Sequence, residues 1–317
     1  FKQKTAYEIY QCDWSSDVCS SDLSFGVRSG SVKLEADDHY LSNGDDSGER
    51  SFHYTNPVVG VRWQAAPGLQ AYLSMARGFE SPTLNEVAYQ ASGAGGLNTG
   101  LDAQTSRQAE LGLKWRTAGV DLDAALFQAN TTNEIGVATN SGGRSAFQNV
   151  GHTRPRGAEL GAGWQIASAW RTRVALSTLQ ATYLDNFLTC NSVPCSAPNV
   201  PVPAGNQIAG TQRASGFAEL AWASGAFGDF GVEWRAAAKT QVDDLNSDHA
   251  PGYAVAALRW SYALPISGPK VEVLARVDNV FDRAYAGSVI VNEANKRFFE
   301  TGAPRGWLLG VKVTGGL

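Results

Sequence analysis

The residue types that carry most enzyme chemistry are few in this chain and lie far apart along it. The four histidines are His39, His53, His152 and His249, and none stands with a cysteine or another histidine at metal-ligand spacing. Serine, histidine and aspartate are all present, but no pattern brings them together as a nucleophile, a base and its orienting acid. We therefore predict that the protein is not an enzyme and has no metal site and no cofactor.

Two of the four cysteines, Cys190 and Cys195, lie close together in a segment that also contains Pro194. In an oxidising compartment such a pair is expected to form a small disulfide. The ring that it closes is short, so the bond stiffens the tip of a loop and adds little to global stability. A metal site is the alternative, but two cysteines supply too few ligands for one.

Residues suited to binding an organic ligand occur in two polar segments, 78–101 and 287–302. Arg297 beside Phe298 combines a charge-assisted hydrogen-bond donor with a stacking surface, which suits an anionic or aromatic chelate. The alternative for each residue is an ordinary solvated or packing position in a loop. The candidate ligand-binding residues are Phe79, Glu80, Tyr89, Asn292, Arg297 and Phe298.

Alternation of apolar and polar residues dominates the chain from Ser24 onward and predicts strands with two different faces. The polar face is rich in Gly, Glu, Arg and Asp, and the apolar face often ends in Trp or Tyr. Small and charged residues suit a water-filled lumen, and terminal aromatic residues suit the boundary of a membrane. Mean hydropathy is only −0.21, but a membrane-spanning strand needs apolar residues only at alternate positions.

Twelve strands are predicted, joined alternately by short turns and long loops, with close to no helix. The join at 140–143 is the exception, because it is short where a long one is expected. This pattern is typical of an all-β, antiparallel, up-and-down transmembrane barrel with its long loops outside the cell. The predicted strands are 24–37, 50–65, 68–79, 105–116, 119–138, 144–166, 169–185, 211–223, 227–241, 251–263, 269–286 and 303–315.

Residues 1–23 are predicted not to belong to the natural protein. The stretch from Lys2 to Leu23 resembles the in-frame translation of a sequencing adapter. We expect residues 1–23 to be a non-native, unstructured segment. The alternative is a polar N-terminal arm that contains Cys12 and Cys19. Residues 24–317 are then the natural part of the chain.

Four motifs in that part resemble those of TonB-dependent outer-membrane receptors, in the order of that family. The segment 76–86, ARGFESPTLNE, resembles their RGF-x-x-P-x-x-x-E stretch, and 109–114, AELGLK, resembles their E-x-G-x-K strand. The segment 148–159 resembles N-x-G-x-x-x-x-x-G-x-E, and 276–285, RVDNVFDRAY, resembles V-x-N-L-F-D-x-x-Y. The resemblance extends over nearly all of the chain from Ser24 to Val313.

The resemblance implies a barrel of about twenty-two strands around an N-terminal plug, of which about twelve strands are present here. We therefore expect a C-terminal portion of the barrel, without the plug, and an open, curved sheet is one form that such a portion can take. The implied function is uptake of a ferric siderophore or a similar bulky nutrient across the bacterial outer membrane. The implied partners are the TonB complex through the plug, the chelate, and the lipid and lipopolysaccharide of that membrane. The protein is expected to be monomeric.

Charged residues of the strands are predicted to face the lumen, where they pair with one another or with the plug. The net charge of −4 gives no indication of a nucleic-acid partner. Two alternatives remain open, namely a passive or adhesive outer-membrane barrel complete at about twelve strands and a soluble β-protein. The predicted lumen-facing residues are Arg77, Glu110, Arg154, Arg156 and Glu159.

Overall fold

The computed structural model describes residues 21–42, 45–90, 96–141, 144–192, 195 and 197–315. In these residues one twelve-stranded antiparallel sheet follows the order of the chain, which makes it a simple meander. Its strands are β1 (Ser21–Ala36), β2 (Gly48–Ala66), β3 (Leu69–Glu80), β4 (Gln104–Thr117), β5 (Val120–Thr132), β8 (Thr153–Ala167), β9 (Trp170–Tyr183), β12 (Ala214–Ala223), β13 (Asp229–Ala237), β16 (Tyr253–Ala263), β17 (Lys270–Asp278) and β20 (Gly306–Thr314).

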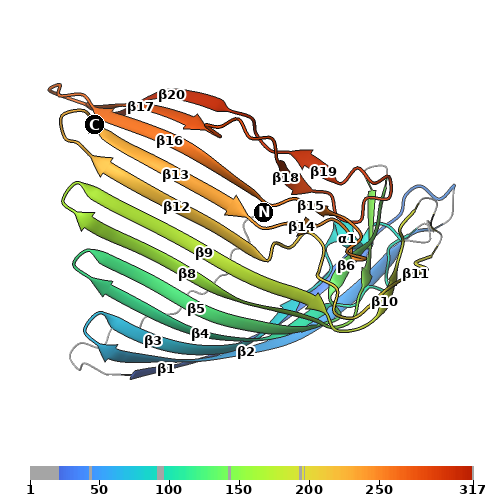
Figure 1. Ribbon diagram of the computed structural model, residues 1–317. Coiled ribbons are helices and arrows are strands. Elements are labelled where there is room, and N and C mark those ends of the chain that lie inside the picture. The colour runs from blue at the N-terminus through green and yellow to red at the C-terminus, as the bar shows by residue number, and fades with distance from the viewer. Residues whose placement is uncertain are drawn as a thin grey trace.

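The sheet is strongly curved and open (Figure 1). Its two edges are β1 and β20, which do not pair with each other in the described part of the chain. The predicted all-β fold, with about twelve antiparallel strands in an open curved sheet, is therefore confirmed. Each edge leaves one row of backbone N–H and C=O groups without a strand partner, which hydrocarbon does not tolerate.

The first strand begins three residues before the predicted boundary at Ser24. Ser21, Asp22 and Leu23 pair with residues 61–63 of β2. Leu23 continues the alternation of Phe25 and Val27, and all three side chains are exposed on the same face. The rest of the predicted adapter segment, residues 1–20, lies outside the described residues.

The exceptional short join at 140–143 has a structural explanation. The predicted strands 119–138 and 144–166 each divide into a strand of the large sheet and a strand of a small hairpin, β6 (Ile135–Ser141) with β7 (Arg144–Asn149). The chain leaves the large sheet at Asn133 and returns at Gly151, and both have positive φ, of 56° and 85°. The connection from β5 to β8 is therefore long, like the others on that side.

The long connections carry small elements of their own, gathered at one end of the large sheet (Figure 1). The two-stranded sheets other than β6–β7 are β10 (Phe187–Thr189) with β11 (Val200–Val202), β14 (Thr240–Gln241) with β15 (His249–Ala250), and β18 (Ala286–Val289) with β19 (Phe299–Thr301). Helix α1 (Leu84–Val87) lies in the β3–β4 connection. Among the described residues no helix has the length and apolar content that crossing a membrane requires.

The two faces of the sheet differ as the alternation predicts. We call the face that is hollowed by the curvature the inner face, because one hollow on it is lined from Tyr72 of β3 to Tyr253 of β16. The opposite, outward face carries exposed apolar side chains at matching register, such as Leu73 opposite Leu111 and Leu111 opposite Leu126. We call these outward apolar residues the apolar belt. It includes Leu73, Met75, Leu111, Leu113, Leu126, Leu160, Leu176, Leu220, Val232, Leu258, Val273 and Leu309.

Aromatic residues border the apolar belt at the end with the short turns. Trp170 of β9 stacks on Trp222 of β12 with ring centroids 5.9 Å apart, and Trp222 stacks on Phe230 at 5.6 Å. Trp260 Nε1 donates a hydrogen bond of 2.7 Å to the carbonyl of Phe227 in a short turn. An amphipathic ring with its polar atom bonded near a turn is typical of residues at a membrane interface.

A pair of neighbouring residues in β9 tests which face meets lipid. Leu176 lies in the apolar belt opposite Leu160, and Ala175 lies on the inner face opposite Gly161. We expect Leu176→Arg to lower the free energy of unfolding in lipid bilayers by about 2–4 kcal/mol, measured by urea titration. Ala175→Arg is the matched control and should cost less than about 1 kcal/mol, because its charge remains in water. Equal costs for both variants would contradict the assignment of the faces.

Candidate functional site

The inner face holds an open hollow of about 790 Å³ across the middle of the sheet. Tyr72 Oη donates a hydrogen bond of 2.6 Å to Glu110 Oε1, and Lys114 Nζ lies 5.6 Å from the centroid of the Tyr72 ring. Asp123 and Glu159 complete the polar lining on the neighbouring strands. The hollow is thus lined by charged and hydroxyl groups that water can reach, as a lumen wall requires.

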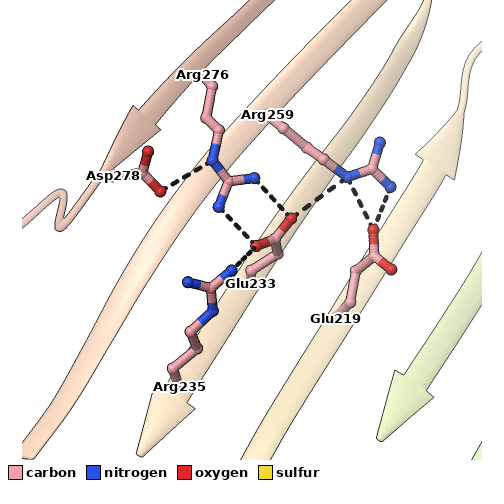
Figure 2. A network of polar contacts seen from close by, with 6 residues as sticks. All are labelled: Glu219, Glu233, Arg235, Arg259, Arg276 and Asp278. Atoms are coloured by element: carbon pink, nitrogen blue, oxygen red, sulfur yellow. Dashed lines mark hydrogen bonds and ion pairs between the residues drawn. The ribbon is translucent and has the colours of Figure 1, made fainter. Parts of the chain in front are cut away.

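A network of charged side chains lies beside the hollow on β12, β13, β16 and β17 (Figure 2). We call it the charge network, and its members are Glu219, Glu233, Arg235, Arg259, Arg276 and Asp278. Two carboxylates on neighbouring strands face two guanidinium groups on the next two strands. Because these four residues lie on four neighbouring strands, the network links β12, β13, β16 and β17 to one another.

Glu233 is at the centre of the charge network and is only 8 % exposed. Both of its oxygens accept hydrogen bonds from Arg276, at 2.9 Å from Nη1 and 2.8 Å from Nη2. Arg259 lies 3.8 Å and Arg235 3.6 Å from the same carboxylate. Arg259 also donates 2.8 Å from Nε to Glu219, and Arg276 donates 2.9 Å from Nε to Asp278. Bidentate, charge-assisted pairs of this kind have a fixed geometry as well as strength.

A second cluster joins the long connections to one another, and we call it the loop hub: Tyr183, Asp244 and Asn292. Tyr183 Oη donates to Asp244 Oδ1 at 2.6 Å, and Asn292 Nδ2 donates to Asp244 Oδ2 at 2.8 Å. Asn292 also donates 2.8 Å to the carbonyl of Val137 in β6. Asn206, in the connection that follows β9, donates 2.8 Å to the carbonyl of Asp244. Four of the long connections therefore meet at the loop hub.

Asp244 is 2 % exposed, and its electrostatics follow from that burial. Burial raises the pKa of this carboxyl above its ordinary value, although the hydrogen bonds from Tyr183 and Asn292 act in the opposite direction. With a raised folded-state pKa, the stabilising contribution is full below the ordinary carboxyl pKa and is lost as the pH rises through the raised value. Burial likewise raises the pKa of Glu134, which accepts a hydrogen bond of 2.8 Å from Thr153.

Several residues of the four motifs form hydrogen bonds with the backbone where strands end and loops begin. Asn279 has a φ of 47° and is buried, and its amide donates to the carbonyls of Arg283 and Ala303 at 2.9 and 3.1 Å. Asp282 accepts a hydrogen bond of 2.9 Å from the backbone of Arg305. The motif at 276–285 thus links the end of β17 to the start of β20.

Two other motifs have the same kind of role. Asn149 bonds the backbone of Asp102 in both directions, at 2.8 and 3.0 Å, and so joins the β3–β4 connection to β7. Glu86 closes a capping box with Thr83 at the start of α1, with Oε2 2.7 Å from the Thr83 nitrogen. These residue types are therefore explained by turn and loop geometry, with no ligand needed.

The predicted ligand-binding residues of the first segment lie at the end of β3 and beyond it. Phe79 stacks on Tyr54 of β2 at 4.6 Å, and Glu80 is the last, exposed residue of β3. Tyr89 lies under the guanidinium of Arg144, 5.3 Å from the ring centroid. Each aromatic ring therefore already has a partner from another element.

The predicted residues of the second segment are divided by burial. Asn292 is 5 % exposed and belongs to the loop hub, so it is not placed to meet a ligand. Phe298 is 7 % exposed and packs edge-on against Phe299 at 6.2 Å. Only Arg297 is exposed. Because Arg297 is exposed and Phe298 is buried, the two side chains do not form one binding surface.

The register assigns the predicted lumen residues to two different faces. Glu110 and Glu159 lie on the inner face. Arg77, Arg154 and Arg156 lie on the outward face, which corrects the prediction. Arg156 is opposite Gln128 and shares the parity of Ala158, Leu160 and Trp164. The prediction was wrong because it assigned charge to the lumen, whereas the outward face also has a polar zone beyond the apolar belt.

Cys190 and Cys195 are joined by a disulfide bond, with their Cα atoms 6.0 Å apart. Cys190 is buried and its backbone nitrogen bonds the carbonyl of Ala138 in β6. The disulfide thus closes a small ring within one connection, and the backbone hydrogen bond of Cys190 joins that connection to β6. In the residues that the structure describes, no three His, Cys, Asp or Glu side chains gather closely enough to hold a metal ion.

The sequence interpretation missed the charge network and Tyr183 and Asp244 of the loop hub. The charge network could have been predicted from the sequence. Glu219, Glu233 and Arg259 all occupy the inner-facing positions of the alternation, at similar distances from the short turns. The loop hub has no such signal in the sequence. Tyr183 is the last residue of β9, Asp244 and Asn292 lie in long connections, and the alternation of apolar and polar residues does not show which connections pack together.

Comparison with known proteins identifies the family and the fold. Residues 10–280 match the family model described as TonB dependent receptor-like, beta-barrel. Among solved structures, the siderophore receptor PiuA from Acinetobacter baumannii superposes with a TM-score of 0.76 at 18 % identity, over 92 % of this chain and 40 % of that one. The copper transporter OprC gives 0.70 at 18 %, over 93 % and 45 %.

The ferric-catecholate import receptor Fiu from E. coli K12, in its closed form, gives a TM-score of 0.69 at 20 % identity, over 92 % of this chain and 42 % of that one. This chain therefore spans less than half the length of each of these three structures. At such low identity, the likeness to these structures establishes the shared fold.

The charge network should stabilise the sheet through Glu233. We expect Glu233→Gln to lower the free energy of unfolding by about 2 kcal/mol, because it removes one of the two carboxylates that are paired with each of the partly buried Arg259 and Arg276. Urea titration in detergent micelles measures the change. Glu159→Gln is the matched control, because Glu159 shares the inner face but has no ion pair in the described residues. Equal losses for the two variants would argue against the network.

The loop hub should hold the long connections together through Asp244. Asp244→Ala leaves the Tyr183 hydroxyl and an Asn292 N–H buried without their acceptor, at a cost of about 2–4 kcal/mol. We expect faster proteolysis within the connections 133–152 and 238–252, with the large sheet still folded. The exposed loop residue Asp248 provides the control Asp248→Ala. Unchanged cleavage in the Asp244 variant would show that the loops do not depend on the hub.

Proposed function

The chain belongs to the TonB-dependent receptor family, through its β-barrel domain, and from that membership we propose that its full-length protein imports a ferric siderophore or a similar bulky metal chelate. The family is one of outer-membrane transporters and receptors, so uptake of a nutrient across that membrane is the general function. Transport in such a receptor is a binding and gating process and needs no bond-making chemistry. The proposal concerns the whole protein, of which this chain supplies one wall of the barrel.

The single observation that carries the proposal is the contrast between the two faces of the sheet. An outward apolar belt bordered by aromatic residues suits lipid, and an inner face with a water-accessible hollow and a charge network suits a lumen. A soluble β-protein would bury one of these faces in a core, and here most residues of both faces are exposed or half-buried along the strands.

The open edges argue against the alternative of a passive or adhesive barrel complete at twelve strands. Such a barrel requires β1 to pair with β20, and the described residues contain no such pairing. A wider barrel, which further strands would close, leaves a lumen large enough for a plug and a bulky solute.

The chemistry available for ligand recognition lies on the side of the long connections. Arg297 is exposed in the β18–β19 connection, two residues before β19, and has no ion-pair partner within the described ranges. Its guanidinium suits the carboxylate, catecholate or hydroxamate oxygens that surround a chelated ferric ion. Phe79, Glu80 and Tyr89 border the same side. The inner-face charges would face the plug, through which the TonB complex supplies energy, and the protein would act as a monomer.

Uptake assays test the proposal. A host without its own receptors, expressing the full-length protein, should grow under iron limitation on at least one member of a ferric siderophore panel, and only when TonB is present. Growth that is independent of TonB would support a passive pore, and growth on none of the chelates would exclude the iron substrate.

Arg297 provides a sharper test once a chelate supports growth. We expect Arg297→Ala to reduce binding of an anionic chelate about tenfold, which is the loss of one charge-assisted hydrogen bond. Lys270→Ala is the matched control, because it removes the same charge from the short-turn end of the sheet. Equal binding by both variants would remove Arg297 from the site.

A further inference from the structure

Four arginines on the outward face form a feature that neither the inner-face chemistry nor the loop packing explains. We call them the arginine belt: Arg77 in β3, Arg107 in β4, and Arg154 and Arg156 in β8. Each follows the apolar belt directly, on the side of the long connections. On the same strands, the outward residues nearest to them are Met75, Ala109 and Ala158.

The register places these arginines in two adjacent rows across five neighbouring strands. Arg77 pairs with Arg107, and Arg107 pairs with Asn130 of β5. Arg156 lies between Gln128 of β5 and Gln180 of β9 in the next row. The apolar belt therefore gives way to a cationic and amide-lined zone at the same level on all five strands.

None of the four arginines has a carboxylate partner in the part of the chain that the structure describes. Arg154 Nε donates 2.9 Å to the amide oxygen of Asn130, and Arg156 donates 3.0 and 2.8 Å to that of Gln180. By contrast, Arg259 and Arg276 of the inner face are each paired with carboxylates. The outward positions of β3, β4, β5, β8 and β9 carry these four cations and no acidic residue.

Arg77 and Arg107 lie directly opposite each other, so an anion is needed at this position in particular. Like charges directly opposite each other on neighbouring strands are destabilising unless an anion lies between them. Guanidinium groups match phosphate oxygens with two parallel hydrogen bonds, and their apolar stems can lie along an apolar surface while the charge reaches the interface. A cationic zone that borders a lipid-facing belt is placed at the depth of lipid headgroups.

We propose that the arginine belt binds the phosphorylated headgroup of a lipid in the membrane leaflet on the side of the long connections. The proposal rests on the membrane placement argued above and deepens it, because it assigns residues to a lipid partner. The arginine belt occupies only one part of the sheet, since the outward positions of β12, β13, β16, β17 and β20 carry no basic residue. The bound lipid would therefore occupy the sector from β3 to β9.

The test compares two double variants that remove the same number of charges at the same spacing. Arg154→Gln with Arg156→Gln changes the outward face of β8, and Arg171→Gln with Arg173→Gln changes the inner parity of the adjacent strand β9. The full-length protein in detergent is mixed with bis-phosphorylated lipid A or with the same lipid after removal of both phosphates. Retained lipid is counted by native mass spectrometry.

The wild-type protein should retain the phosphorylated lipid preferentially. Each arginine near the lipid surface contributes about fivefold, so the outward double variant should bind about 25-fold more weakly. The inner-parity variant should bind within about twofold of wild type. Heat-dependent mobility in SDS gels establishes that both variants are folded, and a protein that is recovered without detergent would contradict the membrane placement separately.

Three results would overturn the proposal. Equal loss in the two double variants would mean that net charge, and not position, controls binding. Equal retention of phosphorylated and dephosphorylated lipid would mean that the headgroup phosphate is not recognised. Displacement of the lipid by millimolar inorganic phosphate alone would assign the arginines to a free anion instead of a lipid.

Discussion

Every strand of this wall must pair its backbone groups with its neighbours while presenting one face to lipid and the other to water. Period-two alternation is the consequence, because a shift of one residue in the register would exchange the two faces completely. The unbroken register from β1 to β20, with small irregularities only at two of the short turns in the large sheet, follows from this constraint. The charge network and the apolar belt then occupy opposite faces of the same strands.

Beyond the apolar belt the strands no longer provide all the pairing, and the long connections need partners of their own. The loop hub supplies buried acceptors and donors where four connections meet, and Asn149 and Asn279 bond loop backbone that would otherwise be unpaired. Asn149 and Asn279, which belong to two of the four motifs, thus lie where a strand ends. Their side chains replace the neighbouring strand as hydrogen-bond partners, which explains why amide and carboxylate side chains recur there.

The sequence was sufficient for the strands and their order because alternation and turn length are local properties. It placed β4, β8 and β9 within one or two residues, apart from the start of β8, where a small hairpin leaves the sheet at Asn133 and returns at Gly151. It could not place Asn292 or Phe298, since their burial depends on which loops pack together. The hairpin β6–β7 was merged with its neighbours for a related reason: its own alternation continues that of β5 and β8 with only a change in φ between them.

The misassigned arginines show why residue type is a poorer guide to orientation than parity. A charged side chain was expected in the lumen, because water was expected only there. A strand that rises through a membrane also leaves the hydrocarbon at its far end, so its outward positions become polar without any change of face. Arg154 and Arg156 keep the parity of Leu160, and only their height differs. The same reasoning separates two sets of arginines in this wall. Arg259 and Arg276 on the inner face are paired with carboxylates of this chain, whereas the four residues of the arginine belt have no acidic partner in the described residues and need an anion from the surroundings.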